Sequence, residues 1–215
     1  MPFTRPIPTL TYELAAWRQG ARYVAGVDEA GRGPMAGPLV AGAAVLDPEV
    51  AALWWSELRD SKVLTAAQRS ELAVRLRESV DFGVGIAGHD EIDDDGLTAA
   101  THRAMVRALG NLARRPEFVL IDAVTLPQDI GPQRALIDGD AICVSIAAAS
   151  IIAKVERDRL MDEYDRTYPH YGFARNRGYC TPDHLSALSE HGPCPIHRRS
   201  FAPVRIYLEQ NGSGD

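Results

Sequence analysis

The chain has 215 residues, of which 46% are hydrophobic and 24% charged, and its formal net charge at pH 7 is -6. These proportions exclude a mainly disordered chain, and the acidic total gives no sign of a nucleic-acid partner. No apolar run approaches the roughly 18 residues of a membrane span, and the N-terminus lacks the basic and then apolar regions of a secretory signal peptide. We therefore expect a soluble cytoplasmic protein.

The hydrophobic pattern alternates between strands and helices along the chain. Short apolar runs predict strands, and apolar residues that recur every three or four positions predict helices. Thr65 and Gln68 match a capping box at the start of one helix. In chain order we expect strands at 23–28 and 39–46, a helix at 65–79, a strand at 82–87, a helix at 97–114, strands at 118–122 and 141–144, and a long helix from Ser145. This order predicts an α/β fold, with a central mixed five-stranded sheet flanked by helices.

The residues after position 165 differ in charge from the rest of the chain. Between 166 and 205 only Asp183 and Glu190 are acidic, whereas the arginines are Arg166, Arg175, Arg177, Arg198, Arg199 and Arg205. We therefore expect a core at 1–165 with an N-terminal lead-in at 1–20. A basic helical extension at 166–208 would pack on this core, and a flexible tail would follow at 209–215.

The segment Asp28-Glu29-Ala30-Gly31-Arg32-Gly33-Pro34 carries the strongest chemical signal. Two adjacent carboxylates at the end of a predicted strand lead directly into a glycine-flanked arginine. The spacing G-x-G-x-x-A also matches a dinucleotide-binding loop, but such a loop must open a helix, and Pro34 and Pro38 lead here into a second strand. The GxxxxGK[ST] pattern of a P-loop is absent from the sequence.

Four acids stand at or beside the ends of predicted strands, and they are Asp28, Glu29, Asp122 and Asp140. Cleavage of a phosphodiester by two metal ions needs several carboxylates close together, because hard cations such as Mg²⁺ prefer oxygen ligands. Successive side chains of a strand point to opposite faces, so Glu29 can share a site with Asp28 only if it lies past the strand, in the glycine turn. These four residues are the candidate catalytic and metal-binding groups.

Several segments between Tyr23 and Val204, taken together, resemble bacterial type 2 ribonuclease H, also called ribonuclease HII. They are VAGVDEAGRGPMAGPLVAGAAVL, Asp60-Ser61-Lys62, Glu91-Ile92-Asp93, Leu120-Ile121-Asp122, Gly139-Asp140, SIAAASIIAKVERD, YGFARNRGYCTPDHL and HRRSFAPV. The resemblance implies the ribonuclease H-like fold and cleavage of the RNA strand in RNA/DNA hybrids. It also implies incision 5′ of ribonucleotides embedded in duplex DNA, by two Mg²⁺ or Mn²⁺ ions on the four acids, leaving 3′-hydroxyl and 5′-phosphate ends.

The resemblance also implies which residues bind the substrate. Those that would sense the ribonucleotide 2′-hydroxyl are Gly31, Arg32 and Gly33, and glycine backbone can approach that group closely. Tyr179 would pack on the sugar at the RNA–DNA junction, and the Arg-Asn-Arg-Gly run before it favours a loop over a core tyrosine. Those that would contact phosphates are Lys62, Arg198 and Arg199. The implied partners are RNA/DNA hybrids and ribonucleotide-containing duplexes, bound by a monomer.

Two positions depart from the family pattern. Asp138 stands two residues before Asp140, where many relatives have lysine, so an extra negative charge lies beside the implied metal site. After the Glu-Ile-Asp motif, the usual asparagine is replaced and the sequence reads Asp95-Gly96-Leu97, which changes an implied contact to the DNA strand.

Two other clusters imitate metal sites. The acidic stretch 91–96 fails as a calcium loop, since its twelfth position is His102, and we interpret it as an acidic first turn ahead of the helix at 97–114. The spacing of the C-terminal cysteines and histidines matches no common zinc finger, so we assign these histidines to loops or phosphate contacts. The cluster comprises Cys180, His184, His191, Cys194 and His197.

Two alternative functions remain open at this point. Another two-metal nuclease or recombinase of the same broad fold would have the carboxylates but not the Gly-Arg-Gly loop with a downstream Gly-Tyr. A non-catalytic hybrid-binding module would keep the basic C-terminal part and lose at least one acid, whereas all four are present.

Overall fold

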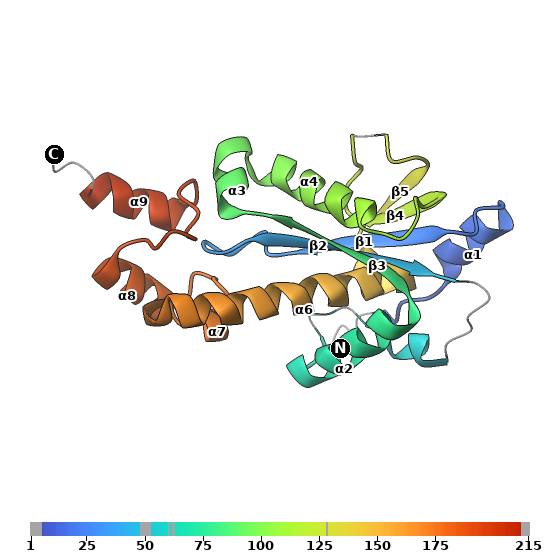
Figure 1. Ribbon diagram of the computed structural model, residues 1–215, viewed down its shortest axis with the longest axis horizontal. Coiled ribbons are helices and arrows are strands. Elements are labelled where there is room, and N and C mark those ends of the chain that lie inside the picture. Colours follow the sequence, from blue (N-terminus) through green and yellow to red (C-terminus); the bar gives the residue numbers. More distant parts are fainter. Residues whose placement is uncertain (1–5, 48–52, 60, 62, 128, 212–215) are drawn as a thin grey trace.

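A mixed five-stranded sheet forms the centre of the molecule (Figure 1). The computed structural model describes residues 6–47, 53–59, 61, 63–127 and 129–211. The strand order is β3-β2-β1-β4-β5, with β1 antiparallel to β2 and parallel to β4. The outer pairs are β2 with β3, antiparallel, and β4 with β5, parallel. The strands are β1 (Val24–Ala30), β2 (Leu39–Leu46), β3 (Asp81–Ala87), β4 (Phe118–Asp122) and β5 (Gln133–Leu136).

Helices cover both faces of this sheet (Figure 1). The helix α4 (Leu97–Gly110) packs on one face, and α6 (Val144–Thr167) with α2 (Ala66–Ser79) packs on the other. The other helical segments are α1 (Thr11–Arg18), η1 (Leu53–Glu57), α3 (His89–Asp95), α5 (Gly139–Ile142), η2 (Pro169–Tyr171), α7 (Phe173–Asn176), α8 (Pro182–His191) and α9 (Ala202–Asn211). Within the described residues, no helix is both long and apolar enough to cross a membrane.

The helix α6 lies in direct backbone contact with the sheet. A Cβ at Gly26 of β1 would lie 2.1 Å from the carbonyl carbon of Ser145, and one at Gly42 of β2 would lie 2.3 Å from the carbonyl oxygen of Ala149. Glycine at these two positions therefore removes the spacer that a side chain would place between sheet and helix. The helix can then bring its own side chains to the edge of β1.

The N-terminal lead-in supports the start of α6. Glu13 of α1 is fully buried and accepts a hydrogen bond of 2.7 Å from the Ser145 N–H. The first N–H groups of a helix have no partner within it, so this carboxylate caps α6. The Thr9 N–H also donates to the Ile142 carbonyl at 3.1 Å, which joins the lead-in to α5.

The basic extension lies at one end of the sheet, opposite α1 (Figure 1). It begins within α6, which continues past position 165 to Thr167, and it ends in α9. Val204 of α9 is buried with Met35 and Leu188, so this last helix packs on the molecule. Residues 209–211, which we expected in a flexible tail, belong to α9, and the rest of that tail lies outside the described residues.

The structure corrects two predicted elements. The expected strand at 141–144 is wrong, because these residues form the end of α5 and the start of α6. The fifth strand is β5 instead, a short edge strand whose sequence QRAL has no apolar alternation. The acidic stretch forms its own helix, α3, and Gly96, with a φ of 83°, separates it from α4. The capping box at Thr65 and Gln68 is confirmed.

We expect Gly42→Ala to lower the free energy of unfolding by at least about 2 kcal/mol, since the new methyl group meets the backbone of α6, which cannot rotate away. Gly110→Ala is the matched control, because a Cβ there meets nothing within 4 Å, and it should be neutral or slightly stabilising. Urea unfolding of both variants measures the difference. Equal stability of the two would contradict the close packing of α6 on β2.

Candidate active site

The site forms where β1 extends past its neighbour β4. The parallel pairing of these strands ends at Val27 and Ile121, so Asp28 and Asp122 are the next residues on the two strands. On its other side β1 stays paired with β2 as far as Ala30. The two carboxylates therefore emerge side by side at one edge of the sheet.

Glu29 lies within β1, so the expectation that it would lie past the strand is wrong. It reaches the site because this part of β1 is no longer paired with β4, and side chains from both faces of the strand can reach the freed edge. Glu29 faces Arg32, whose Nε lies 3.8 Å from Glu29 Oε1, and Arg32 also donates to Thr101 on α4. Asp28 faces α6, where Ser150 hydrogen-bonds its side chain.

The short helix α5 brings the fourth carboxylate to this edge. The Gly139 N–H donates to Asp122 Oδ1 at 2.7 Å, which ties the start of α5 to the end of β4. Asp140 follows directly and is buried. A residue at the start of a helix thus joins three residues from the sheet.

Asp28 lies at the centre of this negative charge, and only 3% of it is exposed. Burial raises the pKa of Asp28 well above its ordinary value, and repulsion from Glu29, Asp122 and Asp140 raises it further. The hydrogen bond from Ser150 acts in the opposite direction. Each of the three other acids therefore lies close enough to Asp28 to repel it, although no three of the described carboxylates are arranged here as a metal-binding group.

The loop at 31–33 is held from inside by Arg198, which is fully buried. Its guanidinium donates to the carbonyl oxygens of Gly31 at 2.7 Å, Arg32 at 3.1 Å and Gly37 at 2.9 Å. In a trans peptide the N–H group points away from the carbonyl. The N–H groups of Arg32 and Gly33 therefore face away from Arg198.

Arg157 of α6 lies under the same loop. A Cβ at Gly31 would lie 2.2 Å from Arg157 Nε, and the φ of Gly31 is 100°, so only glycine fits here. Arg157 donates to the carbonyls of Pro38 and Arg177, each at 3.0 Å. Burial lowers the pKa of Arg157 to about 10 and that of Arg198 to about 9, so both remain charged near neutral pH.

Tyr179 lies beside this loop and is 48% exposed. A Cβ at Gly33 would lie 3.5 Å from the ring atom Cε1 of Tyr179, which places the ring against the loop. Gly178 has a φ of 80°, and a Cβ there would lie 2.3 Å from the Ala36 carbonyl oxygen. The Met35 N–H donates to the Gly178 carbonyl at 2.9 Å, so the backbone before Tyr179 is tied to the segment that follows the loop.

A pocket of about 270 Å³ contains the loop, Tyr179 and the carboxylates of Asp28, Glu29 and Asp122. Sequence reasoning missed four of its lining residues, which are Ser61, Ser150, Lys154 and Arg157. The last three recur every three or four residues in α6 and share one face of this helix, whose first half is apolar. That polar stripe is the signal that could have found them.

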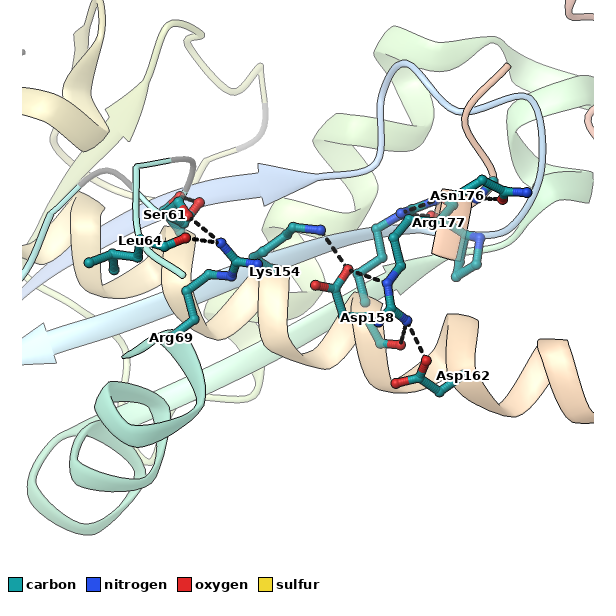
Figure 2. Close-up of polar contacts among 12 residues, drawn as sticks. Ser61, Leu64, Arg69, Lys154, Asp158, Asp162, Asn176 and Arg177 are labelled. Carbon is teal, nitrogen blue, oxygen red and sulfur yellow. Dashed lines mark hydrogen bonds and ion pairs between the residues drawn. The ribbon is translucent and has the colours of Figure 1, made fainter. Parts of the chain in front are cut away.

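Lys154 stands at the pocket within a chain of ion pairs (Figure 2). Its Nζ lies 2.5 Å from Asp158 Oδ1, and the same carboxylate oxygen lies 3.7 Å from Arg177 Nε. Arg177 also pairs with Asp162 at 2.5 Å. Burial lowers the pKa of Lys154. Asp158 thus orients the Lys154 side chain and, through Arg177, links it to the segment that leads to Tyr179.

Ser61 reaches the pocket from the loop before α2. Its hydroxyl lies 2.9 Å from the Ser150 hydroxyl, and Arg69 of α2 donates to the carbonyls of Ser61 at 2.9 Å and Leu64 at 2.5 Å (Figure 2). Lys62, the neighbouring residue predicted to contact phosphate, lies outside the described residues.

The chain matches the family model of ribonuclease HII over residues 25–204. The chain belongs to the ribonuclease HII family. It is 47% identical to ribonuclease HII of Dehalococcoides mccartyi over 203 residues, covering 94% of this chain and 96% of that protein. It is 52% identical to ribonuclease HII of Geobacillus thermodenitrificans over 200 residues, covering 93% and 76% of the two chains.

Solved structures agree with this assignment. Ribonuclease H2 from Pyrococcus horikoshii matches with a TM-score of 0.74 and 32% identity, over 87% of this chain and 98% of that one. A structure titled as the PCNA:RNase HII complex from Archaeoglobus fulgidus matches with a TM-score of 0.67 and 25% identity, over 84% and 95%. The predicted fold and family are confirmed, and the chain is a metal-dependent endoribonuclease with ribonuclease H activity on RNA/DNA hybrids.

Within this ribonuclease HII, the two arginines predicted to contact phosphates differ sharply. Arg198 is fully buried and directs its donors to carbonyls of the chain, so we replace its predicted phosphate contact with the role of holding the loop at 31–33. Arg199 is exposed, and its backbone N–H donates to Asp93 Oδ2 at 2.8 Å. These two adjacent arginines thus point in different directions, Arg198 into the protein and Arg199 into solvent.

Two of the C-terminal histidines are also buried. His184 lies in α8 and is 0% exposed, so the prediction that it lies in a loop or contacts phosphate is wrong. His197 does lie in an irregular segment, but at 2% exposure it is buried. Cys180 is exposed. Across the described residues, no group of three or more histidine, cysteine, aspartate or glutamate side chains is arranged to hold a metal ion.

Strained backbone occurs next to the site residues. In the described part of the chain, the non-glycine residues with positive φ are Ala123, Asp138 and Arg177, at 55°, 52° and 53°. Each lies within two residues of Asp122, Asp140 or Tyr179. Left-handed backbone costs about 1 kcal/mol per residue, and such strain is concentrated at functional sites. The departure at Asp138 thus falls on an exposed residue in the turn before α5.

Arg198→Gln and Arg199→Gln form a matched pair of neighbouring variants. We expect Arg198→Gln to lower the free energy of unfolding by about 2–4 kcal/mol, because it removes the donors from buried carbonyls. Arg199→Gln should change it by less than about 0.5 kcal/mol, while weakening duplex binding in a salt-dependent way. Chemical denaturation and binding titrations at two salt concentrations check both, and equal losses of stability would contradict these assignments.

Proposed function

We propose that this ribonuclease HII incises duplex DNA 5′ of embedded ribonucleotides, as well as cleaving hybrids, with two divalent cations held by Asp28, Glu29, Asp122 and Asp140. The observation that supports this most directly is the single pocket in which three of these carboxylates meet the Gly-Arg-Gly loop and Tyr179. A metal-dependent cleavage site and a sensor for the sugar then lie within reach of one nucleotide.

The four carboxylates fit hard divalent cations by their chemistry. They provide only oxygen ligands, which Mg²⁺ and Mn²⁺ prefer. Burial raises the pKa of Asp28 and repulsion from the other three acids raises it further, and positive charge between them would offset this repulsion. When bound, the cations would stabilise the charge on the phosphate and on the leaving oxygen.

The loop at 31–33 supports recognition of the 2′-hydroxyl. Its carbonyls at Gly31 and Arg32 are occupied by Arg198, so the N–H groups of Arg32 and Gly33 are the ones that face outward. A 2′-hydroxyl oxygen can accept from such a donor, and a deoxyribose has no atom there. The ring of Tyr179 beside Gly33 would pack on the same sugar.

Basic side chains at the pocket and on the C-terminal part would position the phosphates. We assign Lys154 to this role because it lines the pocket beside Asp28 and Glu29, and Arg199 because it is exposed on the C-terminal part. Lys62, next to the pocket residue Ser61, would contribute a further contact. Such contacts provide affinity that falls with added salt.

The reaction is a hydrolysis of the bond between phosphorus and the 3′-oxygen. The oxygen of water joins the phosphorus, the bond to the 3′-oxygen breaks, and a proton from water goes to that oxygen. The products are a 3′-hydroxyl end and a 5′-phosphate on the ribonucleotide. The protein's share is to place the phosphate beside the carboxylates and to hold the ribonucleotide sugar against the loop.

A DNA duplex with one ribonucleotide, incubated with and without Mg²⁺ or Mn²⁺, tests this function. We expect one incision 5′ of the ribonucleotide, only with metal, and none in an all-DNA duplex. Cleavage of the all-DNA duplex would favour another two-metal nuclease of this fold. Binding without cleavage would favour a non-catalytic module.

Asp122→Asn should abolish cleavage and leave duplex binding largely unchanged, because it removes a charged metal ligand but nearly preserves the side chain's shape. Gly139 N–H can still donate to the amide oxygen, so the link to α5 survives. Gel-based cleavage and fluorescence anisotropy measure the two effects. A parallel loss of binding would count against the metal-ligand role.

Tyr179→Ala should lower cleavage at a single ribonucleotide more than cleavage of a long hybrid, because stacking on one sugar matters most when a single position must be selected. Stacking contacts of this kind contribute roughly 1–3 kcal/mol, which corresponds to about 5- to 150-fold. Tyr179→Phe should retain most of the preference, since it keeps the ring. Steady-state kcat/KM on both substrates provides the comparison, and equal losses on the two would indicate a structural tyrosine.

The monomeric state, the cytoplasmic location, the use of Mg²⁺ or Mn²⁺ and the domain boundaries stay predictions. The Archaeoglobus fulgidus ribonuclease HII forms a complex with PCNA. For this chain the residues 209–211 are helical, so a docking peptide would have to follow them or lie elsewhere.

A further inference from the structure

His184 and His197 form a buried pair behind Tyr179. His184 belongs to α8, and His197 lies in the irregular segment between α8 and α9. Their Nε2 atoms lie 3.1 Å apart, and the rings of Tyr171 and Phe173 pack around them. Two histidine nitrogens at this distance can share only one proton, so one ring must donate and the other accept.

The neighbouring contacts determine which ring donates. His184 Nδ1 lies 2.8 Å from the carbonyl oxygen of Tyr179, which only accepts, so this nitrogen carries a proton. Burial lowers the pKa of His184, so the ring is neutral near pH 7 and its Nε2 has a free electron pair. His184 therefore accepts at Nε2 and donates at Nδ1.

His197 has the opposite tautomer. The Cys194 N–H donates to His197 Nδ1 at 3.0 Å, so this nitrogen is unprotonated and Nε2 carries the hydrogen. His197 Nδ1 also lies 3.3 Å from the Cys194 carbonyl oxygen, but the Cys194 N–H is closer and that carbonyl already accepts from the His197 N–H at 3.0 Å. Burial lowers the pKa of His197 to about 4, and it raises that of the Cys194 thiol to about 11, so the thiol keeps a proton that it can also donate to Nδ1.

These contacts form a directed chain of hydrogen bonds. It runs from the Cys194 N–H to His197, from His197 to His184, and from His184 to the Tyr179 carbonyl. The same carbonyl also accepts from the Thr181 N–H at 2.8 Å, so its direction is determined from two sides. Every donor in this series of hydrogen bonds has an acceptor, and each of the four ring nitrogens of the two histidines takes part in a hydrogen bond.

The segment that starts this chain also holds the loop at 31–33. Gly37 N–H donates to the Ile196 carbonyl and Arg198 N–H to the Met35 carbonyl, each at 2.9 Å. Arg198 follows His197 directly and binds the carbonyls of Gly31 and Arg32. One short segment thus reaches Tyr179 through its histidine and the loop through its arginine.

We propose that His184 and His197 are positioning residues for ribonucleotide selection, which hold the Tyr179 backbone in the orientation that places its ring against Gly33. This proposal rests on the role proposed above for Tyr179. Neither histidine would touch the substrate. Their effect would be on the preference for a single ribonucleotide, and not on the carboxylates that carry out the cleavage.

Nitrogen-15 NMR of the histidine side chains in the whole protein at pH 7.5 tests the chain itself. We expect His184 as the Nδ1–H tautomer and His197 as the Nε2–H tautomer, assigned by single His→Gln variants. Two Nε2–H rings, or a charged ring in either residue, would overturn the proposal. This measurement does not depend on any role of Tyr179.

Two substitutions at His184 separate positioning from simple packing. The amide nitrogen of His184→Asn lies near the place of Nδ1 and can still donate to the Tyr179 carbonyl, whereas His184→Gln places its amide near Nε2 and loses that donor. We expect His184→Gln to reduce the ratio of kcat/KM on a single-ribonucleotide duplex to that on a long hybrid by roughly fivefold, the equivalent of one net hydrogen bond. His184→Asn should retain more of this ratio than His184→Gln does.

The Tyr179→Ala background completes the test. If the histidines act through Tyr179, adding His184→Gln to Tyr179→Ala should not change the substrate ratio further. An additional reduction there, or equal ratios in the Asn and Gln variants, would overturn the proposal. If Tyr179→Ala alone leaves the ratio unchanged, the role of Tyr179 fails instead. Glu190→Gln, at an exposed residue of the same helix, is the control and should leave the ratio unchanged.

Discussion

The close approach of α6 to β1 and β2 is the constraint on which the rest of the structure depends. Gly26 and Gly42 let the helix backbone touch the sheet, and no side chain can replace them without moving the helix. This distance lets Ser150 reach Asp28 and lets Arg157 pass under Gly31. A helix held farther away would leave Asp28 without the hydrogen bond from Ser150 and the loop without the support of Arg157. The electrostatics of the site therefore follow from packing between small residues.

Charged residues have two different roles in this protein: carboxylates form the cleavage site, and buried arginines support the loop beside it. The net charge of -6 conceals four carboxylates gathered at one sheet edge and two buried arginines behind the neighbouring loop. Arg157 and Arg198 carry their charge inside the protein, where carbonyl groups solvate it. The basic character of residues after 165 is thus partly structural, and only its exposed arginines are available to a duplex. Bulk composition cannot make this distinction, because it does not record which cations are buried.

Much of the fold and the metal-binding carboxylates could be predicted from the sequence, for physical reasons. The strands at 39–46 and 118–122 are long apolar runs, and the helix at 65–79 has a local capping signal, so each is encoded by neighbouring residues. The edge strand β5 has two exposed residues, Arg134 and Ala135, and depends on pairing with β4, which no local pattern reveals. Glu29 was misplaced because alternation along a strand says nothing of where its partner strand ends. Lys154, Arg157 and the burial of Arg198 depend on tertiary contacts between distant segments.

Apart from α6, which reaches both parts of the site, the carboxylates and the sugar-contacting elements are supported by different segments, and this difference has a consequence for how the enzyme works. The carboxylates rest on β1, β4 and α5, whereas the loop at 31–33 and Tyr179 are both tied to the segment 194–198. Hydrolysis of a phosphodiester is the same chemistry in RNA and DNA, so the carboxylates cannot by themselves distinguish the two. Discrimination has to come from elements that contact the sugar, and in this chain those elements share one support. A change in segment 194–198 would therefore act on the choice of substrate through two residues at once, while the residues that carry out the cleavage stay in place.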